Sequence, residues 1–367
     1  MTDASTNSAT TRGRILWWGR FGNYGPNYPR NRTVMKCLHE LGWEVIEFHP
    51  KLSQTADIEI LFRQVGQIDA VWVPCFRQRD LPAAARWAKR HRVKLIFDPL
   101  ISAYDKQVFE KKKFLPTSYR ARRLLRSEVV LFRLADTVIA DTSCHKDYFI
   151  ETLACDPQQV VVIPVSAEEE LFFPSPVTEQ TIPEFLFFGT FIGLQGPKVI
   201  AEAIALYQGP PIQLTFLGDG PERPLCEQIA QSTPNSLVQV RFEDWIPFHD
   251  LPARIRQAAV CLGIFGEGEK SRRVIPNKVY QALACGRPVI TRLGDAYPKE
   301  LVDNGVTATG MQFLPDTTPD SLAKTIAKQA SAAEDLSERA FATYRKYFSN
   351  DAIRAQLTKI LSQGNSA

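Results

Sequence analysis

Short apolar runs recur along the chain, and longer helical or polar segments separate them. In the first part of the chain these runs are RILWW (14–18), WEVIEF (43–48), AVWVP (70–74), VKLIF (93–97), DTVIA (136–140) and VVVIP (160–164). Because such runs are apolar on both faces, they are typical of strands in a parallel sheet that helices cover on both sides. The alternation therefore predicts an α/β fold.

A proline-rich segment, FFPSPVTEQTIPE (172–184), interrupts this alternation. Proline lacks a backbone donor and breaks helices and central strands, so the segment is predicted to link two domains. A chain of 367 residues is also long enough for two cores of ordinary size. Beyond the segment, similar runs resume at 185–189, 212–218, 238–242, 260–265 and 288–292.

These observations predict two Rossmann-like domains in tandem. In open parallel sheets, ligands bind at the carboxyl ends of the strands, so both sheets are expected to face a central cleft. The predicted parts are a disordered N-terminus at 1–12, a first domain at 13–173, a linker at 174–184 and a second domain at 185–340.

Cysteine usage and hydropathy predict a cytoplasmic protein. The seven cysteines stand singly, without a CxxC pair or a histidine cluster, so neither disulfides nor a zinc site is expected. No apolar run approaches the ~20 residues that cross a bilayer, and the polar N-terminus lacks the apolar region of a signal peptide. Buried free thiols are the expected state of the cysteines.

The stretch RVIPNKVYQALACGRPVI (273–290) predicts a short helix with a basic N-terminus. Pro276 suits the first helical position, and Gly286 followed by Pro288 ends the helix. A helix N-terminus attracts anions, and Arg273 and Lys278 add positive charge there. The stretch is interpreted as a diphosphate site, or alternatively as a solvated basic turn.

Two glycine-rich turns follow predicted strands. The turn GRFGNYG (19–25) lacks the G-x-G-x-x-G spacing of a dinucleotide site, so it is interpreted as a loop that lets a substrate approach the backbone. The turn FLGDGPE (216–222) holds two glycines before a helix and is by itself a weak signal.

FDPLISAYD (97–105) follows another predicted strand, and its two acids should lie at the cleft. Asp98 and Asp105 are interpreted either as a catalytic or sugar-binding pair, or as capping and turn residues.

The segment 106–126 carries eight Lys or Arg residues against one Glu, with apolar residues between them. This pattern favours an anionic membrane surface, which would make the protein peripheral at the inner face of the membrane. A solvated helix face is the alternative. No nucleic-acid-binding motif accompanies the charge, so nucleic acid is not expected as a partner.

Four motifs in the second domain resemble, in order and spacing, the donor-binding half of the family-4 glycosyltransferases, which are retaining enzymes of the GT-B fold. They read FLFFGTFIGLQGPKVIAEAIAL, FLGDGPE, PNKVYQALACGRPVI and DNGVTATGMQFLPDTTPDSLAKTI. The resemblance implies that the second domain binds a UDP or GDP sugar and that the first binds a glycan, lipid-linked or small-molecule acceptor. It also implies no metal and no cofactor, and a last helix around 341–362 that crosses back to the first domain.

The resemblance and the residue patterns together suggest three sets of site residues. The expected catalytic residues are Arg273, Lys278 and Asp98. The expected acceptor contacts are Gly22, Asn23, Tyr24, Gly25 and Asp105. The expected donor contacts are Gly189, Thr190, Gly218, Gly220, Trp245, Ile246, Glu267, Glu269, Pro276, Asn277 and Gln281.

The chain departs from the family pattern at the residues that usually bind the donor. Where the family has an Arg and a Lys that bind the diphosphate, this sequence has Thr190 and Gln195. Where the family has two glutamates, it has Arg273 and Gln281. We expect Arg273 and Lys278 to replace the missing cations, because a departing diphosphate needs neutralising charge.

The sugar contacts must also change, and Glu267 or Glu269 is expected to bind the sugar hydroxyls. In front-face transfer the leaving phosphate takes the acceptor proton, so Asp98 is expected to orient a sugar and not to attack it. The alternatives are a GT-B-like sugar-nucleotide epimerase, an inverting transferase, or a catalytically degenerate scaffold subunit that binds a nucleotide sugar.

Overall fold

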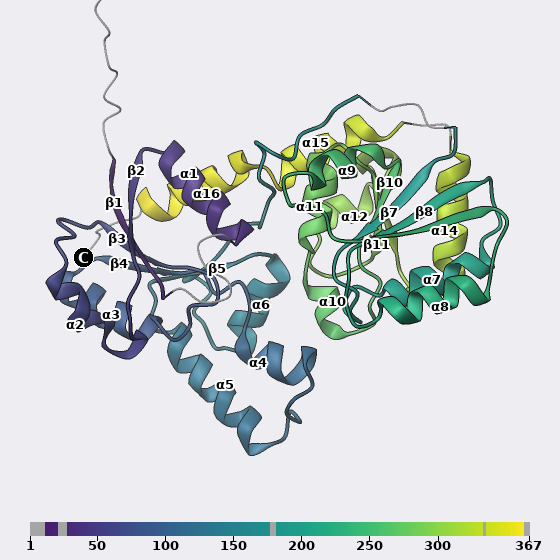
Figure 1. Ribbon diagram of the computed structural model, residues 1–367. Helices are drawn as coiled ribbons and strands as arrows, with labels where there is room; N and C mark the ends of the chain where they lie inside the picture. The colour runs from purple at the N-terminus through teal and green to yellow at the C-terminus, as the bar shows by residue number, and fades with distance from the viewer. Residues whose placement is uncertain (1–11, 21–27, 177–180, 333–334, 363–367) are drawn as a thin grey trace, which may run out of the picture.

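The computed structural model describes residues 12–20, 28–176, 181–332 and 335–362, and it contains two six-stranded parallel sheets. The first sheet has the order β2-β1-β3-β4-β5-β6 and the second has the order β12-β11-β10-β7-β8-β9. Figure 1 shows the two sheets side by side, each with its own helices. The predicted α/β architecture of two Rossmann-like sheets is confirmed. We call the chain up to residue 176 the first half and residues 181–332 the second half.

The first half alternates strands with helices, as the apolar runs predict. Its strands are β1 (Gly13–Trp18), β2 (Trp43–Phe48), β3 (Ala70–Val73), β4 (Lys94–Phe97), β5 (Thr137–Ala140) and β6 (Val160–Val162). Its helices are α1 (Pro29–Glu40), η1 (Ser53–Thr55), α2 (Ala56–Glu59), η2 (Ile60–Phe62), α3 (Leu81–His91), α4 (Ala103–Asp105), the π-helical turn η3 (Lys106–Glu110), α5 (Tyr119–Phe132) and α6 (Ser143–Glu151).

Strand β1 shows why the apolar runs form a covered sheet. Successive side chains of a strand point to opposite faces. Ile15 and Trp17 pack into a core with α1 and the last helix of the chain, whereas Leu16 and Trp18 pack into a core with α3. A strand with helices on both faces must be apolar throughout, which is what the sequence RILWW provides.

The second half repeats this organisation. Its strands are β7 (Glu184–Phe188), β8 (Ile212–Leu217), β9 (Val238–Glu243), β10 (Val260–Leu262), β11 (Val289–Arg292) and β12 (Met311–Leu314). Its helices are α7 (Pro197–Leu206), α8 (Arg223–Ser232), α9 (Leu251–Gln257), α10 (Glu269–Arg273), α11 (Asn277–Ala284), α12 (Lys299–Asp303), α13 (Gly305–Thr309) and α14 (Pro319–Ser331). The edge strand β12 was not among the predicted strands.

Strand β7 lies inside the second sheet, between β10 and β8, and its side chains pack into a core on each face. Phe185 and Phe187 pack on one face of the sheet with residues of α7 and α14. Leu186 and Phe188 pack on the other face with residues of α9 and α11. This second core also includes Leu100, Val165 and Phe172 of the first half, so apolar packing continues from one half to the other on this face.

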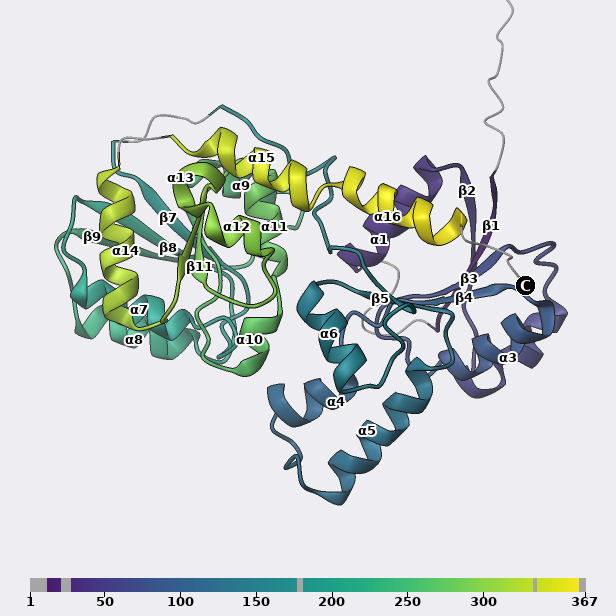
Figure 2. The same ribbon diagram turned by 180° about the vertical axis from the view of Figure 1, so that it is seen from behind.

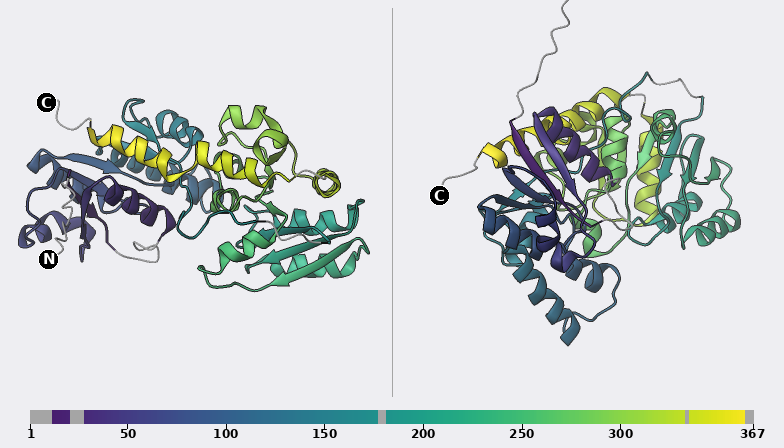
Figure 3. Two further views of the ribbon diagram at one scale, coloured as in Figure 1. Left: turned by 90° about the horizontal axis from the view of Figure 1, so that it is seen from above. Right: turned by 60° about the vertical axis from the view of Figure 1, so that its left-hand side comes forward.

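The chain ends in two helices, where the sequence suggested one helix around 341–362. Helix α15 (Ser337–Tyr347) packs on the second half, and helix α16 (Asn350–Ser362) packs on α1 and β1 of the first half. The views in Figures 1, 2 and 3 show the pair running across both halves. The chain thus crosses back to its first half, with a break at Phe348 and Ser349.

The predicted tail and linker lie partly outside the described residues. Of the N-terminal segment predicted at 1–12, only Arg12 is described, and its backbone amide donates to Gly42 at 2.9 Å. The predicted linker includes residues 177–180, which are not described, and β7 already begins at Glu184.

Candidate functional site

Glycines end two neighbouring strands of the second sheet and let their turns pack closely. Gly189 follows β7 with a φ of 147°, and Gly218 follows β8 with a φ of 128°. A Cβ on Gly218 would lie 2.2 Å from the backbone oxygen of Gly189 and 3.2 Å from the Trp245 ring. Only glycine fits such a contact, so the carboxyl ends of these strands form a compact backbone surface.

The turn that contains Gly220 extends this surface. The amide of Phe191 donates to Asp219 at 3.0 Å, and the amide of Glu222 donates to the backbone oxygen of Phe191 at 3.1 Å. A Cβ on Gly220 would lie 2.7 Å from the backbone nitrogen of Phe191. The two glycines predicted from the turn at 216–222 therefore allow it to pack against the turn that follows β7.

Lys278 lies beneath this surface as a buried cation. Its side chain extends from the first turn of α11 toward β7, and Nζ lies 3.7 Å from the centroid of the Phe187 ring. A Cβ on Gly189 would lie 3.0 Å from that Nζ and 2.4 Å from Oε1 of Gln195, so the two polar groups both face Gly189. Neither has a hydrogen-bond partner among the described residues. Burial lowers the pKa of Lys278 well below its usual range.

Helix α11 begins one residue later than the sequence suggested. Pro276 has φ −72° and ψ 151°, so it is the extended residue before the helix and not the first helical residue. Asn277 is the first helical residue, and no side chain of the described residues caps the helix N-terminus. The amide of Val279 donates to the backbone oxygen of Pro276 at 2.9 Å, which leaves the amides of Asn277 and Lys278 as the uncapped donors at the start of α11.

The loop between β10 and α11 carries the two predicted glutamates on its surface. Glu267 and Glu269 are both exposed. Arg292, at the end of β11, donates from Nη1 to the backbone oxygen of Gly266 and to Oγ of Ser271, the latter at 2.8 Å. Burial lowers the pKa of Arg292, and Arg272 lowers it further, while Glu267 raises it. Arg292 thus fixes the start of this loop.

Arg273 and Asp105 contact each other, although the sequence suggested one for the diphosphate and the other for the acceptor. The distance between Arg273 Nη1 and Asp105 Oδ1 is 3.2 Å, and both side chains are largely buried. Asp105 belongs to the first half and Arg273 to the second, so this ion pair joins the two halves. In the structure the charge of Arg273 is directed at a protein carboxylate.

Asp98 lies inside the first half as the partner of Arg30. Its Oδ2 accepts from Arg30 Nε at 2.9 Å, and the two side chains are 2% and 0% exposed. Arg30 also donates to the backbone oxygens of Ile163 and Pro164. Burial raises the pKa of Asp98 and Arg30 lowers it, with a net increase. The structure therefore gives Asp98 a buried structural partner at the position where a sugar contact was expected.

The remaining predicted residues fall into three groups. Thr190 and Trp245 are exposed at the ends of β7 and β9, and Ile246 next to Trp245 is half-buried. Gln281 is 8% exposed inside α11. The predicted acceptor contacts Gly22, Asn23, Tyr24 and Gly25 lie outside the described residues.

Sequence reasoning missed several residues that lie between the halves. Glu110 pairs with Lys270 across the halves. Tyr148 packs on Arg273, with 5.2 Å between the ring centroid and Cζ. Glu110 and Tyr148 stand in helical segments with no distinguishing pattern in the sequence. Arg292, which contacts its own half, was also missed, although a charged residue at the end of an apolar strand was an available signal.

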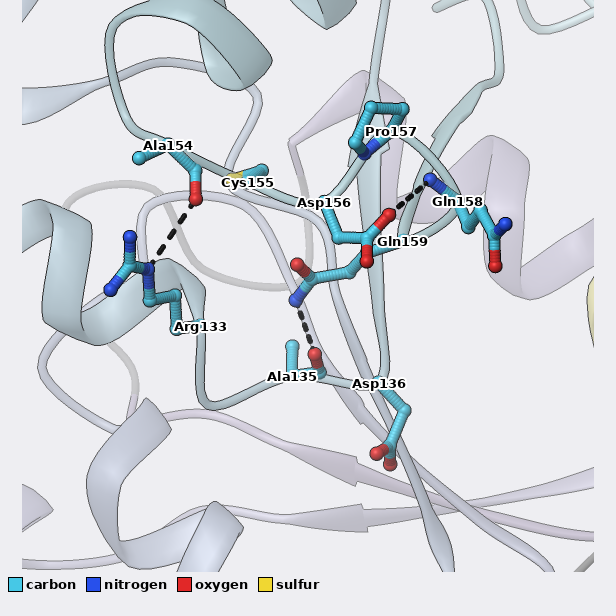
Figure 4. A pocket seen from close by; sticks show the side chains of 9 residues that line it. All are labelled: Arg133, Ala135, Asp136, Ala154, Cys155, Asp156, Pro157, Gln158 and Gln159. Atoms are coloured by element: carbon cyan, nitrogen blue, oxygen red, sulfur yellow. Dashed lines mark hydrogen bonds between the residues drawn. The ribbon is translucent and has the colours of Figure 1, made fainter.

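A surface hollow in the first half lies at the amino ends of strands β5 and β6, away from their carboxyl ends. Figure 4 shows its lining, which comes from the segments that precede β5 and β6. Its polar groups bond to one another, as in the 3.4 Å bond from Arg133 to Ala154 and the 2.8 Å bond from the Gln158 amide to Asp156. The hollow is therefore separate from the strand ends that carry the predicted site.

Among the residues that the structure describes, no three His, Cys, Asp or Glu side chains are grouped as ligands of one metal ion. In the described part of the chain, no helix combines the length and the apolar character needed to span a bilayer.

Two family models match the chain, one in each half. The model described as "Glycosyl transferase 4-like domain" matches residues 29–166, and the model described as "Glycosyl transferases group 1" matches residues 182–331. Together they cover most of the chain. No curated protein matches it in sequence.

Solved structures share the arrangement of both halves. The structure of Anabaena Alr3699/HepE in complex with UDP has a TM-score of 0.69 at 17% identity, over 95% of this chain and 99% of that one. A glycosyltransferase from Rickettsia africae has a TM-score of 0.61 at 12% identity, over 96% and 98% of the two chains. The apo form of the lipopolysaccharide outer core galactosyltransferase WaaB has a TM-score of 0.64 at 15% identity, over 95% and 99%.

Proposed function

This chain belongs to the GT-B glycosyltransferases, with group 1 and family-4-like domains, and from that premise we propose that it transfers a sugar from a UDP sugar to an acceptor hydroxyl with retention of configuration. The observation that carries the proposal is the buried Lys278 ammonium, which has no hydrogen-bond partner among the described residues. UDP is the proposed nucleotide because the similar Anabaena protein was solved with UDP and with UDP-glucose.

An unpaired cation in a buried place is energetically costly. Removing an ammonium group from water costs several kcal/mol unless an anion or hydrogen bonds compensate. A diphosphate next to Gly189 would supply that anion, and the glycine at this position lets it approach the backbone. The backbone N–H groups of Asn277 and Lys278, which no described side chain caps, would add donors at the start of α11. Lys278 and α11 thus replace the Arg and Lys that the family usually has.

The proposed chemistry depends on charge stabilisation at the leaving group. A bound diphosphate favours the protonated form of Lys278, because an adjacent anion opposes the effect of burial on its pKa. As the sugar departs, negative charge develops on the β-phosphate, and the Lys278 ammonium stabilises it. That phosphate oxygen then takes the proton of the attacking hydroxyl on the same face of the sugar, which gives retention. In this proposal, protein cations neutralise the charge of the leaving diphosphate, and no metal ion takes part. Turnover that requires Mg²⁺ and stops with EDTA would contradict this part.

Contacts to the sugar are proposed for the exposed carboxylates of the loop that follows β10. Glu267 and Glu269 lie on this loop, whose start Arg292 fixes. The proposed donor site thus draws on the ends of β7, β8 and β11 and on the start of α11.

The acceptor is proposed to be lipid-linked or close to a membrane, which would place the protein peripherally at the inner face. Figures 1 and 2 show α5 and the segment before it projecting away from both sheets. Leu115 and Tyr119 on this projection are 75% and 72% exposed. Exposed basic residues surround them at Lys111, Lys112, Lys113, Arg120, Arg122, Arg123 and Arg126. Co-sedimentation with phosphatidylglycerol vesicles tests this, and binding that does not depend on the anionic lipid would contradict it.

Calorimetry and thermal unfolding with UDP test the donor site. Lys278→Met should weaken UDP binding by about 10- to 100-fold, because a charged hydrogen bond contributes about 1.5 to 3 kcal/mol. Without ligand, the same variant should be more stable than the wild type by about 1 to 3 kcal/mol, because a buried amine without a partner is removed.

Lys324→Met is the matched control, because this lysine is exposed on α14 of the same half. It should bind UDP as the wild type does. Wild-type affinity in Lys278→Met would rule out the proposed diphosphate site, and a wild type that binds no nucleotide would rule out the function. A product whose anomeric configuration is inverted, as measured by NMR, would rule out the retaining reaction.

A further inference from the structure

Among the described residues, two ion pairs join the halves, and both use basic residues of α10. Arg273 lies 3.2 Å from Asp105, the last residue of α4. Lys270 pairs with Glu110, the last residue of η3. In each pair the base comes from the second half and the acid from the first. Figures 1 and 2 show α10 facing α4 between the two sheets.

The Arg273 guanidinium also packs on aromatic rings of the first half. Its Cζ lies 5.2 Å from the centroid of Tyr148 and 5.9 Å from that of Phe109, which is within range of a cation–π interaction. The hydroxyl of Thr142 donates to the backbone oxygen of Arg273 at 3.4 Å. Side chain and backbone of one residue thus contact α6, η3 and the loop before α6.

The burial of these charges depends on contact between the halves. The side chains of Arg273 and Asp105 are 17% and 6% exposed, and those of Lys270 and Glu110 are 11% and 26% exposed. Solvent screens such pairs less than pairs on an open surface. If the halves separated, water would hydrate all four charges and offset the loss of the two ion pairs, so the contact is reversible.

Helix α10 belongs to the same loop as the proposed donor contacts. Glu267 precedes it, and Pro276 follows it and leads into α11 with Lys278. Arg292 holds the loop at Gly266 and at Ser271 within α10, so the contact of α10 with the first half links the loop to that half. The position of this loop relative to the acceptor therefore depends on the two ion pairs.

The geometry points to α10 as an interdomain clasp, in which Arg273 and Lys270 bind Asp105 and Glu110 and hold the two halves in the arrangement where transfer takes place. This inference rests on the proposed transfer reaction, but not on contact between Lys278 and the diphosphate. Arg273 is then a positioning residue that acts through the first half, and the diphosphate is left to Lys278.

Charge reversal tests the clasp. Arg273→Glu and Asp105→Arg should each give a larger radius of gyration in small-angle X-ray scattering, because the pair is replaced by like charges. Each should also slow the hydrolysis of UDP-glucose, used as a probe, by about 10- to 100-fold, since small misplacements of reacting groups have effects of this size. UDP affinity should stay at the wild-type value. The combined variant should recover the radius and the rate, because the pair forms again with opposite polarity.

Arg272→Glu is the matched control. Arg272 neighbours Arg273 on α10 but pairs with Asp295 of its own half at 3.4 Å, so its reversal should leave radius and rate unchanged. Wild-type radius and rate in both single variants would overturn the clasp. Lost UDP affinity in Arg273→Glu without recovery in the combined variant would also overturn it and assign Arg273 to the diphosphate. A wild type that binds no UDP would contradict the proposed function, while the scattering comparison would still decide the clasp.

Discussion

Asp141 and His145 form a buried ion pair at the start of α6. Nδ1 of His145 contacts Oδ1 of Asp141, and the side chains are 5% and 7% exposed. The hydroxyl of Thr142 caps the helix by accepting from the amide of His145 at 3.1 Å. Burial lowers the pKa of His145, but the Asp141 carboxylate raises it by more, so the net pKa lies above its usual 6.5.

This pair predicts a pH dependence of stability. A group whose pKa rises on folding stabilises the folded state fully below its unfolded pKa and loses that contribution as pH rises through the folded pKa. The free energy of unfolding should therefore fall as pH rises above 6.5. Urea unfolding at a series of pH values measures this slope. His145→Asn should remove this contribution, whereas the exposed His249→Asn should keep it. An unchanged slope in His145→Asn would contradict the assignment.

The sequence did not determine the partners of individual charged residues. Arg273 and Lys278 stand five positions apart and look equivalent in the sequence, yet Arg273 pairs with Asp105 whereas Lys278 is buried without a hydrogen-bond partner among the described residues. Asp98 follows a strand, where the sequence predicted a sugar contact, and it is paired with Arg30. The partner of a charge depends on contacts between distant parts of the chain, which no local pattern records.

At the scale of elements, the turns after β7 and β8 can pack together only because each contains a glycine. Gly218→Ala would place a Cβ 2.2 Å from the backbone oxygen of Gly189, at a φ of 128° that other residues rarely adopt. We expect a loss of about 1 to 3 kcal/mol in stability from the strained backbone alone, and more from the collision. UDP binding should weaken as well, because the displaced turn lies beside Lys278.

Gly305→Ala is the matched control for backbone strain. Gly305 also has a positive φ, of 68°, but no heavy atom lies within 4 Å of its Cβ position. Calorimetry should show unchanged UDP affinity in this variant and a smaller loss of stability than in Gly218→Ala. Equal effects of the two substitutions would contradict the role of close packing at Gly218.

Secondary structure was largely predictable because it depends on local patterns. Each predicted apolar run forms a strand, with ends that differ by a few residues at most. The strand β12 was missed because its four residues include Gln312 and so give no continuous apolar run. Pro276 was assigned one position too far into its helix, since an extended residue before a helix and a first helical residue both suit proline.

At the scale of the whole molecule, α16 links the end of the chain to the core of the first half. Ile353, Leu357 and Ile360 pack beside Ile15 and Val34, and all are buried. Leu357→Ala should cost about 2 to 5 kcal/mol, because it leaves a cavity in a packed core. The loss should appear in the first half although the substitution lies near the end of the chain.

Hydrogen–deuterium exchange can locate this effect. Leu357→Ala should speed exchange in β1 and β2 and leave β7 and β8 protected, whereas Leu322→Ala on α14 should do the reverse, because Leu322 belongs to the core of the second half. Faster exchange in β7 and β8 of Leu357→Ala would contradict the confinement of the Leu357 core to the first half and α16.

The sequence by itself determined the two parallel sheets and the resemblance of the second half to a donor-binding domain. These features are local or periodic, so apolar runs, prolines and glycines record them directly. Only the tertiary structure decided which cation is paired, which acid is buried and which helix joins the halves. Burial and charge pairing depend on residues far apart in the chain, such as Asp105 and Arg273. They can therefore be identified only from the folded structure.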